Sequence, residues 1–328
     1  MVHFLLRIGA PLMKHVKNAL SIIILLAVCL FSTALHVHAS STDKPIVVTT
    51  TTVLESIVKD LAGDKVSVVV IASPAICPAH YDVRPSDVEA FRIADLILAH
   101  GIEPWVEDLK KASGSEAPIV YIKGPWNMPD TLKQRYSEVA NAIEEHLGIS
   151  VSDKLSKSLS EIDEVKQRLQ GYAEEHGFKN TPVVSMMWQK GFISFLGFKV
   201  VATYRSPEMV SAKEYSEIIE NATKYGAVLV IDNLQSGVEL GEKIASEVGA
   251  VEVALTNFPG TAPGLNNVTE VMKYNARLLA EALVEATVMK EKTMLERQIG
   301  FWRTTTYTLA VLAIALGLAL LYIVWRRR

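Results

Sequence analysis

Short runs of β-branched residues alternate with segments of helical period from Pro45 onward, and this alternation constrains the fold more than any other feature of the chain. A strand followed by a helix and then by another strand is typical of a parallel sheet with helices on its faces. The pattern therefore predicts an α/β fold. The expected strands are Ile46–Thr49, Val66–Ile71, Leu96–Ala99, Ile119–Ile122, Pro182–Ser185, Val200–Thr203, Ala227–Ile231 and Val251–Leu255.

The segments between these strands have the apolar spacing of amphipathic helices. Ser86 begins one of them and is a candidate N-cap, because its hydroxyl can accept a hydrogen bond from a free backbone N–H of the first turn. The expected helices are Val53–Ala62, Ser86–Ala94, Glu103–Lys111, Ala212–Lys224 and Gly237–Glu247.

A longer amphipathic helix is expected from about Val151 to His176, between the two groups of strands. Its length exceeds that of an ordinary crossover helix, so we expect two lobes, each with a mostly parallel sheet flanked by helices, joined by this long backbone helix. The predicted division is an N-terminal α/β lobe at 40–148, a linking backbone helix at 149–178 and a C-terminal α/β lobe at 179–303. A last amphipathic helix, about Val268–Arg297, leads out of the second lobe.

Both ends of the chain are apolar. Ser21–Leu35 follows Lys14 and Lys17 and precedes small residues at 37 and 39, which predicts a signal peptide at 1–39. Tyr307–Trp325 contains 19 residues without a charge, enough to cross a bilayer as a helix, and Arg326–Arg328 follow at once. By the positive-inside rule these arginines stay in the cytoplasm, so 304–328 is predicted to be a transmembrane anchor with a short basic tail.

The segment between these ends is acidic and has a single cysteine. Six basic residues lie in the two ends, and removing them lowers the net charge from −3 to −9. Binding to nucleic acid through phosphate contacts is therefore not expected. Cys77 is alone in this body, which excludes an internal disulfide. The triplets that begin at Asn221 and Asn267 fit the glycosylation pattern and weakly favour exposure outside the cell.

Three motifs in the first half carry a resemblance: Pro78-Ala79-His80-Tyr81-Asp82-Val83-Arg84-Pro85-Ser86-Asp87, then Ala94-Asp95-Leu96, then Gly101-Ile102-Glu103-Pro104-Trp105. Their order and spacing resemble the metal-binding substrate-binding proteins of zinc- and manganese-type ABC importers, the cluster A-I family. The resemblance covers about residues 45–290. It implies two α/β lobes, a rigid linking helix, a metal ion held between the lobes, and an ABC permease with its ATPase as partners.

The expected metal site departs from the family pattern, in which two or three histidines and a carboxylate bind the ion. By resemblance, His80 corresponds to the first ligand. Trp126 falls at the second histidine, Met186 or Met187 at the third, and Asn257 at the carboxylate. Thioether sulfur suits Cu(I), whereas zinc prefers imidazole, thiolate and carboxylate, so the expected ion is Zn, Mn or Cu.

Other residues near these motifs keep two interpretations each. Cys77 is either a further ligand, through its spacing to His80, or a buried thiol. Trp126 either presents its indole face to a cation or lines the wall of the site. Asp82, Asp87 and Asp95 are expected to support the site or the loop around it without binding the ion. The remaining histidines of the body are expected at the surface: His100, His146 and His176.

The leading functional hypothesis is an extracytoplasmic receptor that captures a transition-metal ion for an ABC importer, held at the outer face of the membrane by Tyr307–Trp325. The alternative is a surface interaction or adhesion protein on the same scaffold, with a decayed metal site. A third version keeps the receptor role but replaces the metal by another ligand. No phosphate-binding loop or nucleophile elbow is present, so an enzyme is not expected.

Overall fold

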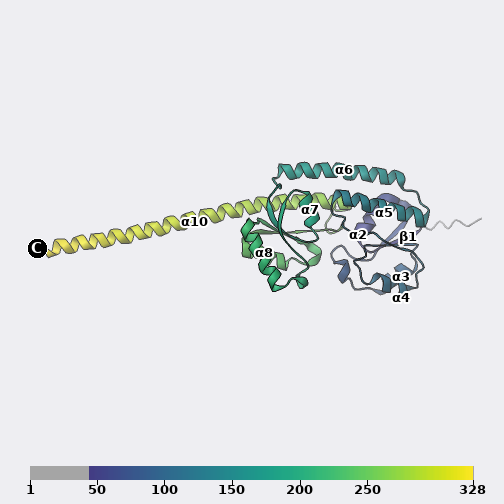
Figure 1. Ribbon diagram of the computed structural model, residues 1–328, viewed down its shortest axis with the longest axis horizontal. Helices are drawn as coiled ribbons and strands as arrows, with labels where there is room; N and C mark the ends of the chain where they lie inside the picture. Colours follow the sequence, from purple (N-terminus) through teal and green to yellow (C-terminus); the bar gives the residue numbers. More distant parts are fainter. Residues whose placement is uncertain (1–43, 328) are drawn as a thin grey trace, which may run out of the picture. The chain divides into compact units, whose positions relative to one another are not determined.

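The computed structural model describes residues 44–327, and the predicted signal peptide at 1–39 lies outside them. The body contains two parallel sheets of four strands (Figure 1). This arrangement confirms the predicted α/β fold with two lobes. The boundaries proposed for the lobes and the linker remain predictions.

The first sheet has the strand order β2-β1-β3-β4, and every neighbouring pair is parallel. On one face, α3 and α4 pack against β1 and β3 through Phe91 and Leu109. On the other face, α2 and α5 pack through Leu54 and Tyr136. Its elements are β1 (Ile46–Thr49), α2 (Thr52–Ala62), β2 (Ser67–Val70), α3 (Pro85–Arg92), β3 (Leu96–Ala99), α4 (Val106–Ser113), β4 (Ile119–Tyr121) and α5 (Pro129–Leu147).

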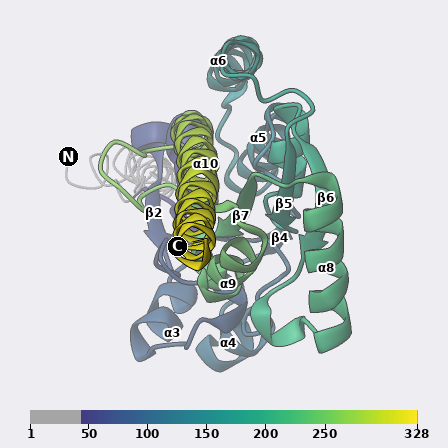
Figure 2. The same cartoon turned by 90° about the vertical axis from the view of Figure 1, so that its left-hand side faces the viewer.

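The second sheet has the order β6-β5-β7-β8 and is also parallel throughout. Helices α8 and α9 cover one of its faces, with Ile218 and Ile244 in the core (Figure 2). Helix α7 and the first turns of α10 cover the other. The elements are β5 (Pro182–Met186), α7 (Lys190–Phe195), β6 (Lys199–Tyr204), α8 (Ala212–Tyr225), β7 (Leu229–Asn233), α9 (Glu239–Val248), β8 (Val251–Leu255) and α10 (Val268–Arg326).

The expected long helix between the two sheets is α6 (Ser152–Glu175). Its buried residues Ile162, Val165 and Leu169 belong to one hydrophobic cluster that contains residues of both sheets. Helices α5 and α7 have no counterpart among the sequence-based predictions. The helix predicted at Ser86 begins one residue earlier, at Pro85, so the expectation that Ser86 is the N-cap was wrong.

Helix α10 is continuous from Val268 to Arg326 and combines the predicted amphipathic helix with the apolar end. The oxygen of the Asn267 side chain caps it by accepting a hydrogen bond from the N–H of Glu270 at 3.1 Å. Its buried positions end at Ala282, beyond which large apolar residues such as Val288 and Leu295 are exposed. Length and composition make this helix a candidate membrane span.

A buried carboxyl group lies between the second sheet and α9. Asp232 on β7 is 1% exposed, and its Oδ1 accepts a hydrogen bond from the Tyr204 hydroxyl. A Cβ atom at Gly241 on α9 would stand 1.7 Å from Oδ2, so this close approach requires glycine. Burial raises the pKa of Asp232 to about 8 and also raises the pKa of neighbouring Glu252. Oδ2 of Asp232 and Oε1 of Glu252 are both buried and have no hydrogen-bond partner among the described residues.

This pair makes stability depend on pH. A carboxyl group with a raised pKa binds its proton more tightly in the folded protein, so the free energy of unfolding falls as the pH rises from about 4, near the unfolded pKa, to about 8. We expect Asp232→Asn to flatten this decline, because the amide stays neutral and still accepts from Tyr204. Urea unfolding at several pH values in this window measures it. The control is Asp108→Asn on the exposed side of α4, and an unchanged slope in Asp232→Asn would contradict the assignment.

Candidate functional site

The loop that carries His80 is held firmly against the first lobe. A single turn, η2 (Pro78–His80), places the His80 side chain at the surface and leaves Cys77 half-buried. The Trp105 indole N–H donates to the carbonyl of Pro78 at 2.8 Å. The ring of Tyr81 packs on the ring of Trp105, with 5.5 Å between centroids. His80 therefore sits on a braced backbone with its imidazole in solvent.

The three aspartates differ in their surroundings. Asp87 is buried, and its Oδ2 accepts from the Tyr81 hydroxyl at 2.9 Å and from the N–H of Arg84 at 2.7 Å. These bonds hold the end of the His80 loop at the start of α3. Burial, and then the hydrogen bond to Asp87, raise the pKa of Tyr81 to about 12. Asp95 accepts from the N–H of Ile46 at 2.7 Å and fixes the start of β1. Asp82 is exposed.

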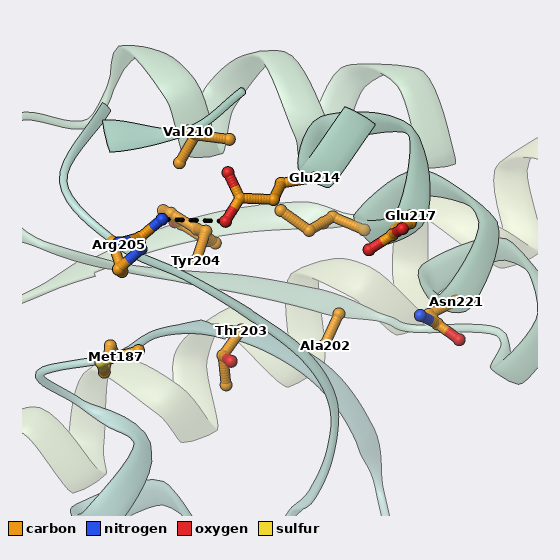
Figure 3. Close-up of a pocket in the computed structure, with 10 residues that line it drawn as sticks. Met187, Ala202, Thr203, Tyr204, Arg205, Val210, Glu214, Glu217 and Asn221 are labelled. Carbon is orange, nitrogen blue, oxygen red and sulfur yellow. Dashed lines mark hydrogen bonds and ion pairs between the residues drawn. The ribbon is translucent and has the colours of Figure 1, made fainter. Parts of the chain in front are cut away.

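The two methionines at the end of β5 point in opposite directions. Met186 is fully buried in the core between the second sheet, α8 and α9, so its sulfur does not reach an ion arriving from solvent. Met187 is 44% exposed and lines a surface hollow of about 300 Å³ between β6 and α8 (Figure 3). Arg205 and Glu214 form an ion pair of 2.9 Å at its rim, and Asn221 also lines it.

Trp126 lies where the two lobes meet, and its partner on the first lobe is a histidine. His100 was expected at the surface but is 1% exposed. Its ring stacks on Trp126 with 4.1 Å between centroids, and its nitrogens contact the Thr51 hydroxyl at 2.8 Å and the Ile122 carbonyl at 2.9 Å. Burial lowers the pKa of His100, so the imidazole is neutral.

Glu103 helps to hold the His100 ring in the interior. Its carboxylate accepts from the Thr50 hydroxyl at 2.5 Å, from the N–H of His100 at 3.1 Å and from the N–H of Ile102 at 2.9 Å. A buried carboxylate needs such donors. The turn after β3 is thereby tied to the end of β1, and this turn carries the His100 ring into the interior.

Side-chain amides occupy the second lobe's side of the boundary. Asn257 is 7% exposed, and its amide N–H donates to Oδ1 of Asn233 at 3.3 Å. The amide of Gln189 donates to the same oxygen at 3.1 Å. Gln235 donates to the Thr256 hydroxyl at 2.9 Å. These amides were not predicted from the sequence, although several lie at or just after the ends of β5 and β7, whose carboxyl ends meet at one sheet edge.

The structure does not gather the predicted ligands into one recognisable metal centre. Within residues 44–327, no group of three or more His, Cys, Asp or Glu side chains is placed to hold an ion. His80 and Met187 are exposed and Met186 is buried, while Asn257 is engaged by other amides. The donors that an ion from solvent can reach are thus His80, Met187 and, in part, Cys77.

The first lobe resembles a known family in sequence. Residues 47–147 match the family model of zinc-uptake complex component A, periplasmic. A manganese ABC transporter substrate-binding lipoprotein, PsaA of Streptococcus pneumoniae, is 35% identical over 130 residues, which cover 34% of this chain. That match spans 42% of the pneumococcal protein, less than half of its length. These are binding proteins of transport systems, in agreement with the expectation that the chain is not an enzyme.

Solved structures extend the likeness to both lobes. A crystal structure of ZnuA has a TM-score of 0.61 at 19% identity and covers 73% of this chain and 99% of its own. A manganese-bound periplasmic metal-binding protein of Candidatus Liberibacter asiaticus has a TM-score of 0.63 at 14% identity, covering 73% of this chain and 100% of its own. At these identities the likeness concerns the fold.

The interior position of His100 can be tested by truncation. We expect His100→Ala to destabilise the protein by about 2–4 kcal/mol, because it removes a buried ring that stacks on Trp126 and leaves two polar partners unsatisfied. His146→Ala is the matched control, since His146 is exposed on α5 and should change stability by less than about 0.5 kcal/mol. Urea unfolding of both variants measures the difference, and equal stabilities would contradict the buried role of His100.

Proposed function

We propose that this chain, whose first lobe matches the zinc-uptake family model and whose fold resembles that of ZnuA, is the extracytoplasmic substrate-binding component of a transition-metal ABC importer. The observation that carries the proposal is the sequence match over residues 47–147, which contain the His80 loop. The two-lobed fold extends that match to the rest of the body. An ABC permease and its ATPase are the partners that this role requires.

The available donors favour a soft ion. Within the His80 loop, His80 offers an imidazole and Cys77 a thiol, whereas the family's carboxylate position is occupied by the amide of Asn257. Sulfur and imidazole suit Cu(I) and tolerate Zn(II), while Mn(II) prefers oxygen ligands. We therefore propose that Cu(I) or Zn(II) binds at the His80 loop in preference to Mn(II).

Metal titration of the full chain in detergent tests this proposal. We expect one Cu(I) or Zn(II) per chain, with weaker binding of Mn(II). Replacing His80 by Ala removes a ligand, so we expect the affinity to fall about 10-fold or more, the range that follows loss of even a supporting group. The control is His146→Ala on the exposed side of α5. The absence of stoichiometric binding of all three ions would end the transport proposal.

The alternative of a surface interaction protein with a decayed metal site also has an observation in its favour. The Trp126 indole N–H donates to the backbone carbonyl of Asn257 at 3.1 Å, so residues at two family ligand positions are in direct contact. A chain that binds no ion in the titration but keeps its fold would support this alternative.

The proposed location depends on α10. The apolar part of α10 is a candidate membrane-spanning helix, and the arginines that follow it favour a cytoplasmic C-terminus. In right-side-out membrane vesicles with an epitope tag after Arg328, we expect external protease to digest the body and to leave a short tagged fragment. In inverted vesicles the tag should be removed and the body protected. The reverse pattern would contradict the proposed orientation.

A further inference from the structure

Hydrogen bonds between uncharged groups join the two lobes directly. Asn127, from the loop before α5, donates to the carbonyl of Trp188 at 2.8 Å and to Oδ1 of Asn257 at 3.3 Å. Trp126 donates to the carbonyl of Asn257 at 3.1 Å. Gln235 donates in the other direction, to the carbonyl of Pro74 on the His80 loop, at 3.0 Å. We call Trp126, Asn127, Gln235 and Asn257 the latch.

The latch is sheltered from water. Asn127, Gln235 and Asn257 are all buried, and Trp126 is half-buried. The indole of Trp126 lies between the His100 ring of the first lobe and Phe258 of the second, whose ring centroid is 6.0 Å away. Opening the lobes would expose these rings and leave buried amide groups without partners until water replaced them, and both changes oppose opening.

The chemistry of the latch requires neither an ion nor a proton. Its donors are indole and amide N–H groups, and its acceptors are carbonyl oxygens of the backbone and of a side-chain amide. These groups do not titrate in the physiological range. In a site where a metal joins two lobes, the contact depends on the ion. Here all of the donors and acceptors are groups of the protein itself.

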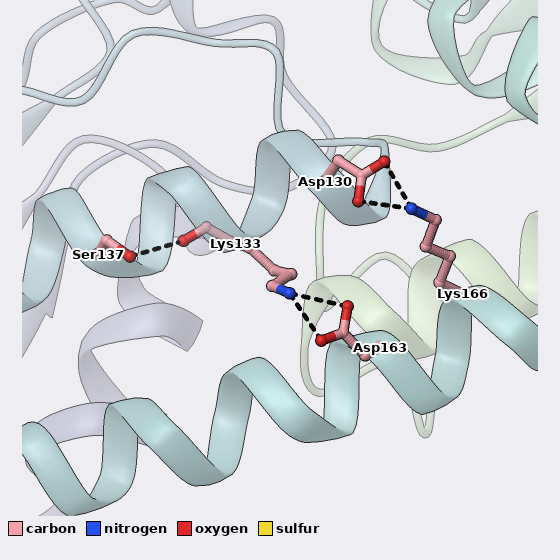
Figure 4. A network of polar contacts seen from close by, with 5 residues as sticks. All are labelled: Asp130, Lys133, Ser137, Asp163 and Lys166. Atoms are coloured by element: carbon pink, nitrogen blue, oxygen red, sulfur yellow. Dashed lines mark hydrogen bonds and ion pairs between the residues drawn. The ribbon is translucent and has the colours of Figure 1, made fainter.

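The linking helix supports the same arrangement. Lys133 on α5 binds Asp163 on α6 at 2.6 Å, and Asp130 binds Lys166 at 2.7 Å (Figure 4). Helix α6 also packs on α2 and α10, which belong to different lobes. The connection between the lobes is therefore held on both sides, and the latch lies at the boundary where the lobes would part.

We propose that the latch keeps the two lobes docked in the absence of any ion, so that metal binding does not set the distance between them. This assigns Trp126 and Asn257, which stand at family ligand positions, to lobe docking. The assignment holds whether or not an ion binds at His80, since the latch bonds do not include that side chain. Ligand capture at the His80 loop would then be a surface event on an already closed body.

Fluorescence energy transfer within the full chain in detergent tests the proposal. Donor and acceptor dyes attached through ketone-bearing amino acids at Lys111 and Lys213, exposed residues of the two lobes, leave Cys77 unaltered. We expect the same distance distribution in chelator and with Zn(II), Mn(II) or Cu(I). A shift of the wild-type distance on adding or removing metal would overturn the proposal, whereas the metal titration reports on ion binding independently.

Variants of the latch provide a second test with the same fluorescence measurement. Asn127→Ala removes both bonds of that amide, and we expect a longer and broader distance distribution. Gln235→Ala removes the bond to Pro74, should act in the same direction, and keeps the test valid if Asn127→Ala does not fold. Asn141→Ala is the matched control, because Asn141 is exposed on α5, and it should match the wild type. Folded latch variants with the wild-type distribution would refute the role of the latch.

Discussion

The burial of one hydrophobic cluster against both sheets is the constraint on which the rest of this structure depends. Val47 and Leu98 of the first sheet and Val183 and Leu229 of the second belong to the same buried cluster, together with residues of α2, α5, α6 and α10. Because burial of apolar area dominates the free energy of folding, neither sheet can move freely without exposing part of this cluster. The two lobes thus share one core, and the latch joins them at the loops that follow the strands.

The shared core brings together the loops that follow the strands. Backbone carbonyls in these loops then need hydrogen-bond donors. Loops that follow parallel strands meet at one edge of each sheet, and backbone carbonyls there are partly buried, as with the carbonyls of Trp188 and Asn257. A buried polar group without a partner costs free energy. In this protein the amide of Asn127 and the indole of Trp126 satisfy those carbonyls. The replacement of ligand-type side chains by neutral donors is therefore consistent with a boundary that is closed by protein groups alone.

Helix α10 joins two environments in one element. Its first turns are buried against β8 and α6, whereas its later turns carry exposed apolar residues. A continuous helix transmits its direction over its whole length. The packing of residues such as Met272 and Leu279 in the core therefore also fixes the direction in which the candidate membrane span leaves the body.

The sequence by itself determined most elements of the fold, although it did not indicate α5 and α7. Strand positions such as Leu96–Ala99 and Val251–Leu255 were predicted to the residue, because alternating runs of β-branched and helical residues are local properties of the chain. The linking helix was predicted within one residue at each end for the same reason. The motifs around His80 indicated the family for the first lobe, since they depend only on residue type and spacing.

Only the tertiary structure decided the positions of side chains from distant segments. His100 and Trp126 are separated by α4, β4 and their loops, so no local pattern shows that their rings stack in the interior. Adjacent Met186 and Met187 lie on opposite sides of the strand end, one in the core and one in solvent. Asn127 and Asn257 are 130 residues apart, and their contact exists only because the common core brings the two lobes together. Burial and long-range hydrogen bonding depend on the packed chain as a whole, which is why residue type and spacing alone did not determine them.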